Sequence, residues 1–430
     1  MRESQTARRA GYAPTNTELG RRGLHTRAAI VRSAAHLFLT HGMHGTSVEA
    51  IAKASGSSRA TVYQYFEDKE AIYRELVAQC APDVADHVKV LGRLGPDVEG
   101  LLNLSRWLEH WANLYDQHAV VLLDFPGIGN PGAVVHAAPN PYVEALTDRL
   151  RTEGVQGMNP EDAAAAFVRI AHMVNVYRHR GMFNLPDSAT VTYSTTIALQ
   201  AMLFPDTPQA VLSALPRPPV INFDCAPQSL SSLPPTSKAP AAPSPVRADI
   251  AAAASTLFAR AGYHSTSMDD IAVAANVSRA TLYRHFRTKL AILSELTNWA
   301  IIEGQDVAAG LQRLADDGFT RDSLHTWLAR YVRFHRAYAG VNSTWYDGGV
   351  STRLSDAVTA AMRPFQAAAT ALLRRSGLPA GIDLRVGTAV FLGILGRLTE
   401  MADVGGCEEA DDETAEFMLR VITRAFDMHC

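Results

Sequence analysis

One segment of this chain of 430 residues occurs twice in its own sequence, and this repeat constrains the fold more than any other feature. The first copy begins at Arg27 and reads RAAIVRSAAHLFLTHGMHGTSVEAIAKASGSSRATVYQYFEDKEAIYREL. The second begins at Arg247 and reads RADIAAAASTLFARAGYHSTSMDDIAVAANVSRATLYRHFRTKLAILSEL, without a gap and with about half of the positions identical. Because Trp107 and Trp327 keep the same offset of 220, the sequence predicts a tandem duplication of one larger unit.

Proline separates the two copies. Of the 22 prolines, eleven lie between Pro205 and Pro245. Repeated proline favours extended backbone and prevents a helix from continuing, so residues 205–246 are predicted to be a semi-rigid linker. On either side, apolar residues recur at spacings of three and four, and no long alternating β-branched run occurs. These patterns predict an all-α fold in two halves.

Composition excludes several classes of protein. With 47% hydrophobic and 19% charged residues, the chain can bury a core, which excludes wholesale disorder and collagen-like sequence, and its net charge of −3 argues against a polycation. Cys80, Cys225, Cys407 and Cys430 have no metal-ligand spacing, so we expect free thiols in a reducing cytoplasm and no metal site. No apolar stretch is long enough to span a membrane, and no P-loop, GxSxG or HExxH motif occurs, so we expect neither a membrane protein nor an enzyme, and no cofactor.

Each copy of the repeat begins with a predicted amphipathic helix. Gly42 ends this helix in the first copy and Gly262 ends it in the second, since glycine accepts a positive φ. Capping-box spacing follows at Thr46–Glu49 and, in weaker form, at Thr266–Asp269. These signals predict that a second helix begins directly after the turn that ends the first helix.

The second helix is short and ends at Gly56 or at Asn276, the two residue types that adopt a left-handed turn most readily. Ser58 and Ser278 are then the predicted N-caps of a third short helix. Two helices joined by a tight turn within about twenty residues form a helix-turn-helix unit.

The third helix has the composition of a helix that enters the major groove of DNA. It reads SRATVYQYF in the first copy and SRATLYRHF in the second, with Val62 and Phe66, or Leu282 and Phe286, as the predicted inward anchors. A helix in a major groove needs small residues for close approach and donors for base edges. Hydroxyl groups, and a lysine at the start of the next helix, suit phosphate oxygens.

The motif GxxxTS, a short helix, and SRATxYxxFxxK resemble the N-terminal signature of TetR-type transcriptional regulators. The resemblance is specific over residues 27–76 and 247–296 and architectural elsewhere. It implies double-stranded operator DNA as a partner. Ala60 and Ala280 stand where the family commonly has glycine, and a methyl group is small enough for the groove. The DNA-facing residues that the resemblance implies are Thr46, Arg59, Ala60, Thr61, Tyr63, Gln64, Tyr65 and Lys69, with Thr266, Arg279, Ala280, Thr281, Tyr283, Arg284, His285 and Lys289.

The same resemblance implies the domain organisation. A disordered basic arm (residues 1–24) precedes the first DNA-binding domain (25–79) and the first helical ligand-binding and dimerisation domain (80–204). The linker (205–246) leads to the second DNA-binding domain (247–299) and the second helical domain (300–430). Each half is thus a three-helix head followed by a helical bundle.

The helical domains contain aromatic clusters at helical spacing. In family terms such domains bind a small effector, so these aromatic residues are candidates for a ligand pocket, although simple core packing explains the same spacing. An acidic segment at residues 405–414 is expected to be a solvated loop. The candidate pocket residues are Trp107, Trp111, Tyr115, Trp327, Tyr331 and Trp345.

The duplication suggests an assembly. The segments Ala163–Arg178 and Leu384–Thr399, each followed by another helix, resemble the pairs that form a four-helix dimer interface in the family. The two halves are therefore expected to pair within one chain as a covalent pseudo-dimer that reads a pseudo-palindromic operator, with a homodimer of tandem chains as the alternative. A ligand-responsive repressor is the predicted function. An activator, or a helical small-molecule-binding protein that keeps the same heads, remains open.

Overall fold

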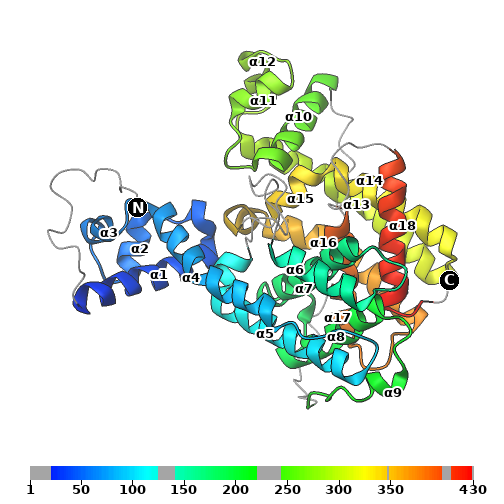
Figure 1. Cartoon of the computed structure of the whole chain (residues 1–430). Helices are drawn as coiled ribbons and strands as arrows, with labels where there is room; N and C mark the ends of the chain where they lie inside the picture. The colour runs from blue at the N-terminus through cyan, green and yellow to red at the C-terminus, as the bar shows by residue number, and fades with distance from the viewer. Residues whose placement is uncertain (1–20, 124–140, 220–243, 346–347, 400–407, 429–430) are drawn as a thin grey trace. The chain divides into compact units, whose positions relative to one another are not determined.

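The computed structural model describes residues 21–123, 141–219, 244–345, 348–399 and 408–428, and every regular element in these ranges is helical (Figure 1). The predicted all-α fold is confirmed. The chain divides into unit 1 (residues 1–86, 114–124 and 345–354) and unit 2 (87–113, 125–344 and 355–430). The helices are α1 (Arg21–Gly45), α2 (Val48–Ala54), α3 (Arg59–Tyr65), α4 (Lys69–Val90), α5 (Val98–Leu122), α6 (Pro141–Glu153), α7 (Pro160–His179), η2 (Met182–Asn184), α8 (Ser188–Leu203), α9 (Gln209–Leu212), α10 (Pro245–Ala261), α11 (Met268–Ala274), α12 (Arg279–His285), α13 (Lys289–Asp317), α14 (Arg321–Ala337), α15 (Ala339–Trp345), α16 (Gly348–Ser376), α17 (Leu384–Leu398) and α18 (Glu408–Ala425).

Unit 1 contains the first head, built from α1, α2 and α3. α2 packs against α1, and α3 packs against α2. Ile30 and Phe38 of α1, Ile51 of α2, and Val62 and Phe66 at the end of α3 are all buried. Burial of a large apolar side chain stabilises a fold by roughly 1.5–3 kcal/mol, so this small core is what holds the outward face of α3 in place.

Unit 2 contains the second head, built in the same way from α10, α11 and α12. α10 packs against both α11 and α13. Ile250, Phe258, Ile271, Leu282 and Phe286, which are the counterparts of the first core, are buried. The repeat in sequence is therefore a repeat in structure.

Residues with positive φ lie at the four predicted helix ends. Gly262 (φ 82°) ends α10, whereas Gly42 (φ 71°) marks a kink within α1, which continues to Gly45. Gly56 (φ 65°) and Asn276 (φ 53°) follow the second helices. These four positions need glycine or asparagine because bulkier side chains are strained at positive φ.

The N-cap of the second helix lies one residue later than the capping-box spacing predicted. The Ser47 hydroxyl accepts from the backbone N–H of Ala50 at 3.1 Å. In the second copy, Ser267 and Asp270 form a reciprocal capping box. The prediction that started the box at the preceding threonine was wrong because that threonine is turned inward, toward the end of the first helix.

The helical part of unit 2 brings together helices from both halves of the chain. α17 packs against α7 and α8, and α18 packs against α8 and α14 (Figure 1). Gly393 of α17 permits a close approach, since a Cβ built on it would lie 3.2 Å from the Cβ of Met173 in α7. Ser194 of α8 accepts a hydrogen bond from the backbone N–H of Asp383 at 3.0 Å. The four helices α7, α8, α17 and α18 are called the paired bundle below.

Three boundaries differ from the sequence prediction. The last residues of the predicted arm belong to α1, and residues 1–20 lie outside the described ranges. In the predicted linker, the part before residue 220 contains α9 and the buried Leu215, α10 already begins at Pro245, and residues 220–243 are not described.

The acidic segment is also not the solvated loop that was expected. From Glu408 onward it belongs to α18, where Asp411 is buried and pairs with Arg336. Carboxylates are favoured in the first turns of a helix by its dipole, which explains why acidic residues open this helix. None of the described helices is long and apolar enough to cross a membrane.

Candidate nucleic-acid interface

The N-terminus of α3 and that of α12 are each capped by a serine side chain. In α3 the Ser58 hydroxyl accepts from the backbone N–H of Thr61 at 3.0 Å, and Ser278 accepts from Thr281 at 3.1 Å in α12. This confirms both predicted caps, and each threonine hydroxyl also lies within hydrogen-bond distance of its serine hydroxyl. Thr61 and Thr281 are therefore half-buried members of the cap, with the rest of the outward face left exposed.

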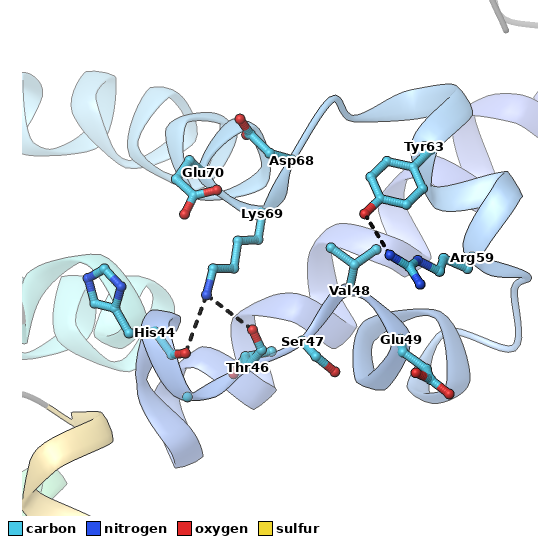
Figure 2. A pocket seen from close by; sticks show the side chains of 11 residues that line it. His44, Thr46, Ser47, Val48, Glu49, Arg59, Tyr63, Asp68, Lys69 and Glu70 are labelled. Carbon is cyan, nitrogen blue, oxygen red and sulfur yellow. Dashed lines mark hydrogen bonds between the residues drawn. The ribbon is translucent and has the colours of Figure 1, made fainter. Parts of the chain in front are cut away.

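The outward face of α3 presents Arg59, Ala60, Tyr63 and Gln64 to solvent, while Tyr65 is half-buried. Arg59 and Tyr63 lie together, with the guanidinium 3.5 Å from the phenol oxygen and 5.5 Å from the ring centroid (Figure 2). This hydrogen bond raises the pKa of Arg59 above its ordinary value, so the guanidinium remains charged. The pair supplies a cation and a hydroxyl at one spot, which suits a phosphate oxygen.

The second head differs at the same positions. Arg279 of α12 forms an ion pair with Asp269 of α11, whereas its counterpart Arg59 meets a tyrosine. Ala280, Tyr283 and Arg284 are exposed, and His285 is half-buried with its carbonyl oxygen accepting from Arg247 at 2.7 Å. The two outward faces are related but are not equivalent in charge.

A hollow beside α3 collects the remaining predicted residues of the first head. The ends of α1, α2, α3 and α4 line it, and Figure 2 shows the ammonium group of Lys69 pointing into it. Lys69 Nζ donates to the carbonyl oxygens of Met43 at 2.8 Å and of Thr46 at 3.3 Å. Its first role is therefore to join the start of α4 to the end of α1, and its charge stays at the rim of the recognition face.

Lys289 repeats this arrangement in the second head. It donates to the carbonyl oxygens of Tyr263 and Thr266, and its ammonium lies 4.4 Å from the centroid of the Tyr263 ring. Burial lowers the pKa of Lys289 below its ordinary value. Both lysines thus join the start of the next helix, α4 or α13, to the end of the first helix of their head and add positive charge to the head.

Thr46 and Thr266 are placed differently from the other predicted residues. Both are buried, and their hydroxyls donate to the carbonyl oxygens of Gly42 at 2.8 Å and of Gly262 at 2.9 Å. These side chains close the turn after the first helix and do not lie on the outward face. Sequence reasoning gave them an outward role because their place in the motif does not reveal the direction of the side chain.

A repeated ion pair was missed by the sequence reasoning. Arg27 of α1 forms a two-pronged pair with Glu75 of α4, with N–O distances of 2.6 and 2.8 Å, and Arg247 pairs with Glu295 in the second head. The Arg27 guanidinium also lies 5.0 Å from the centroid of the Phe66 ring. The signal that could have revealed this contact is that an arginine and a glutamate stand 48 residues apart in both copies.

Four of the predicted pocket residues pack in two stacked pairs. In unit 2, the rings of Trp107 and Trp111 are stacked 5.8 Å apart and are buried, and His87 packs over both. Burial lowers the pKa of His87 to about 4, so its ring is neutral near pH 7. Tyr115, in the part of α5 that belongs to unit 1, is also buried.

In the second half, Trp327 and Tyr331 are likewise stacked, 5.6 Å apart, and Trp327 donates to the carbonyl oxygen of Val307. The side chain of Trp345 lies outside the described residues. A narrow cavity between α5, α7 and α8 is lined instead by apolar residues such as Leu108 and Val174 together with polar ones such as Asn175 and Arg178. Among the described residues, no group of His, Cys, Asp and Glu is arranged to hold a metal ion.

Comparison with known proteins places both heads in one family. The family described as "Bacterial regulatory proteins, tetR family" matches residues 30–76 and 250–296. The HTH-type transcriptional regulator UidR of Escherichia coli K12 is 29% identical over 139 residues, which cover 31% of this chain and 68% of that protein. The biofilm operon negative transcriptional regulator IcaR of Staphylococcus aureus is 26% identical over 108 residues, or 24% of this chain and 57% of that protein. Among solved structures, Salmonella enterica GusR is 25% identical, covers 44% of this chain and 98% of its own, and has a TM-score of 0.32.

Proposed function

Because this chain belongs to the tetR family of bacterial regulatory proteins and carries the DNA-binding domain of that family twice, we propose that one chain binds one operator as a pseudo-dimer. DNA binding in the regulation of transcription is the function of its relatives. The pairing of α7 and α8 with α17 and α18 inside a single chain is the observation that carries this proposal.

The pseudo-dimer follows from how helix-turn-helix proteins read DNA. Two recognition helices enter successive major grooves, about 34–36 Å apart, and ordinary dimers obtain them from two chains. Here α3 and α12 are the two recognition helices, and the paired bundle joins the halves that carry them. One tandem chain therefore supplies what two ordinary chains supply.

Within each head, we assign the contacts by exposure. Ala60 and Ala280, at the second position of their helices, allow the backbone to approach the base edges. The Arg59–Tyr63 pair and Tyr283 contact phosphate oxygens, and Gln64 and Arg284 face base edges. The backbone N–H groups at the start of α3 and α12 add weaker positive charge.

The regulator is proposed to repress transcription in the absence of an effector. Its relative IcaR is described as a negative regulator. A small molecule lowers operator affinity if it binds the helical domains more tightly when the heads are arranged unsuitably for DNA. The size of this decrease is set by the difference between its affinities for the two arrangements. To admit such a molecule, the packed cluster around Trp107 or the narrow cavity lined by Arg178 would have to open.

Selection of bound sites from random DNA tests the proposed function. We expect one enriched motif made of two related but unequal half-sites, because Gln64 and Tyr65 in the first head become Arg284 and His285 in the second. Gln64→Arg combined with Tyr65→His should convert the first half-site to the second and change the preference between the two sequences by about tenfold or more. No enrichment of any sequence would contradict the proposed function.

Release of Arg279 from its ion pair should strengthen DNA binding. An exposed pair of this kind is worth about 0.2–1 kcal/mol, so Asp269→Asn is expected to tighten operator binding by about 1.4- to fivefold, measured by titration at fixed salt. Asp412→Asn, at an exposed position in α18, is the matched control and should leave affinity unchanged. Weaker binding by Asp269→Asn would mean that the ion pair orients Arg279 for DNA.

A further inference from the structure

The contact between α7 and α17 includes two residues that occupy equivalent positions in the two halves. Asn159 is the N-cap of α7 and Asp383 is the N-cap of α17, which aligns the two helices at an offset of 224. In this register Met173 is the counterpart of Arg397. The sequence thus places an apolar residue in one half and a cation at the same site in the other.

These two residues touch. Arg397 is 3% exposed, and its Nε donates to the sulfur of Met173 at 3.1 Å. Gly393, one helical turn before Arg397, lies against the same methionine and would bring a Cβ within 3.2 Å of the Met173 Cβ. Met173 therefore fits between a glycine and a guanidinium of the other half.

Equivalent positions of two related helices meet where the helices cross at a two-fold or pseudo-two-fold axis. If two second halves paired in the same way, Arg397 would face another Arg397 and two guanidinium groups would share one buried site. Removal of two like charges from water into one site is strongly unfavourable.

A pair of two first halves meets a different obstacle. The counterpart of Gly393 is Arg169, so a long side chain would stand where the glycine leaves room for Met173. In the structure Arg169 is half-buried and its guanidinium lies near the carbonyl oxygen of Ala165 in its own helix. Only the pairing of a first half with a second half places Met173 against both one buried guanidinium, that of Arg397, and one glycine, Gly393.

We propose that the Met173–Arg397 contact selects the pairing of a first half with a second half and rejects the pairing of two like halves. Discrimination of this kind relies on an unfavourable interaction in the wrong complex as much as on a favourable one in the right complex. The inference rests on the proposed use of the paired bundle as the interface between halves. It goes further in naming the residues that determine which partner is accepted.

A charge-exchange series in the full chain tests this selection. Met173→Arg reproduces the Arg–Arg contact of a like pair and should lower the thermal unfolding midpoint by about 5 °C or more. Arg397→Met should change the midpoint little, since replacement of a buried cation by an apolar side chain is often neutral. The double variant Met173→Arg with Arg397→Met should recover most of the loss, because the site again holds one arginine and one methionine.

The control series uses Met158→Arg, another buried methionine, in place of Met173→Arg. Arg397→Met should not restore its stability. If the Met173→Arg double variant is no more stable than the sum of its two single changes predicts, or if it fails to fold, the selection proposal is overturned. Recovery in the double variant supports it even if Met173→Arg alone does not fold.

The mass of the wild-type protein separates this inference from the proposed function. If two chains exchange halves, the unlike contact forms between chains and the charge-exchange series gives the same recovery. The single-chain pseudo-dimer would then be wrong, while the selection by Met173 and Arg397 would stand. A single-chain mass without recovery would support the pseudo-dimer and overturn the selection.

Discussion

Replacement of Tyr63 and Tyr283 by alanine should abolish retardation of operator DNA while the protein remains helical. Their side chains are 38% and 49% exposed, so their loss removes little from the core. Each hydrogen bond to a charged phosphate contributes roughly 1.5–3 kcal/mol, so two of them together correspond to a loss in affinity of about 100-fold or more. The Tyr63 change also removes the ring beside which the Arg59 guanidinium lies.

Electrophoretic retardation and circular dichroism measure the two parts of this expectation. Tyr63→Phe with Tyr283→Phe keeps the rings and removes only the hydroxyls, so it should lose the part of the affinity, about 100-fold, that the two hydrogen bonds supply. Any further loss in the alanine variant measures the contribution of the rings. Val77→Ala, at a position of α4 with a similar exposed fraction, should bind like the wild-type protein. Wild-type affinity in the double alanine variant would show that the outward faces of α3 and α12 do not make the contacts assigned to them.

Acidification from pH 8 to pH 5 should lower the free energy of unfolding by about 2 kcal/mol for each of two buried histidines. Burial lowers the pKa of His87 to about 4, and burial together with the charge of Arg397 lowers the pKa of His335 to about 3. An unfolded histidine titrates near 6.5, so below that pH the unfolded chain binds protons that the folded chain does not. The stability that the two neutral rings contribute is therefore fully present above about pH 6.5. It is lost as the pH falls toward the pKa values of the two histidines in the folded protein.

Urea unfolding at the two pH values measures this loss. His87→Gln and His335→Gln should each remove about half of the pH dependence that the two residues produce. His41→Gln, at an exposed position, is the control for the substitution itself. Equal stability at pH 8 and pH 5 would contradict the neutral state assigned to both rings.

The parts of the fold that local rules determine could be predicted from the sequence. Gly56, Gly262 and Asn276 end helices because few residues tolerate positive φ, and Ser58 caps α3 because its hydroxyl accepts from a free N–H group. Thr46 shows the limit of such rules. Its direction depends on the carbonyl oxygens at the end of α1, which only the folded head brings within reach.

The helical domains were less predictable for a similar reason. Spacing of three and four placed Trp107 and Trp111 on one face of a helix but did not say whether that face meets a ligand or another helix. No pattern in the sequence singled out Arg397 within the segment Leu384–Thr399. Its burial follows from the meeting of α17 with α7, a contact between residues that are far apart in the chain.

The number of chains on one operator is the most direct test of the pseudo-dimer. Native mass spectrometry of the complex with a selected operator, combined with a footprint, measures it. The pseudo-dimer predicts one chain and a protected region of about 20 base pairs, the length needed for two recognition helices in successive major grooves. Two chains on an operator of that length would contradict it.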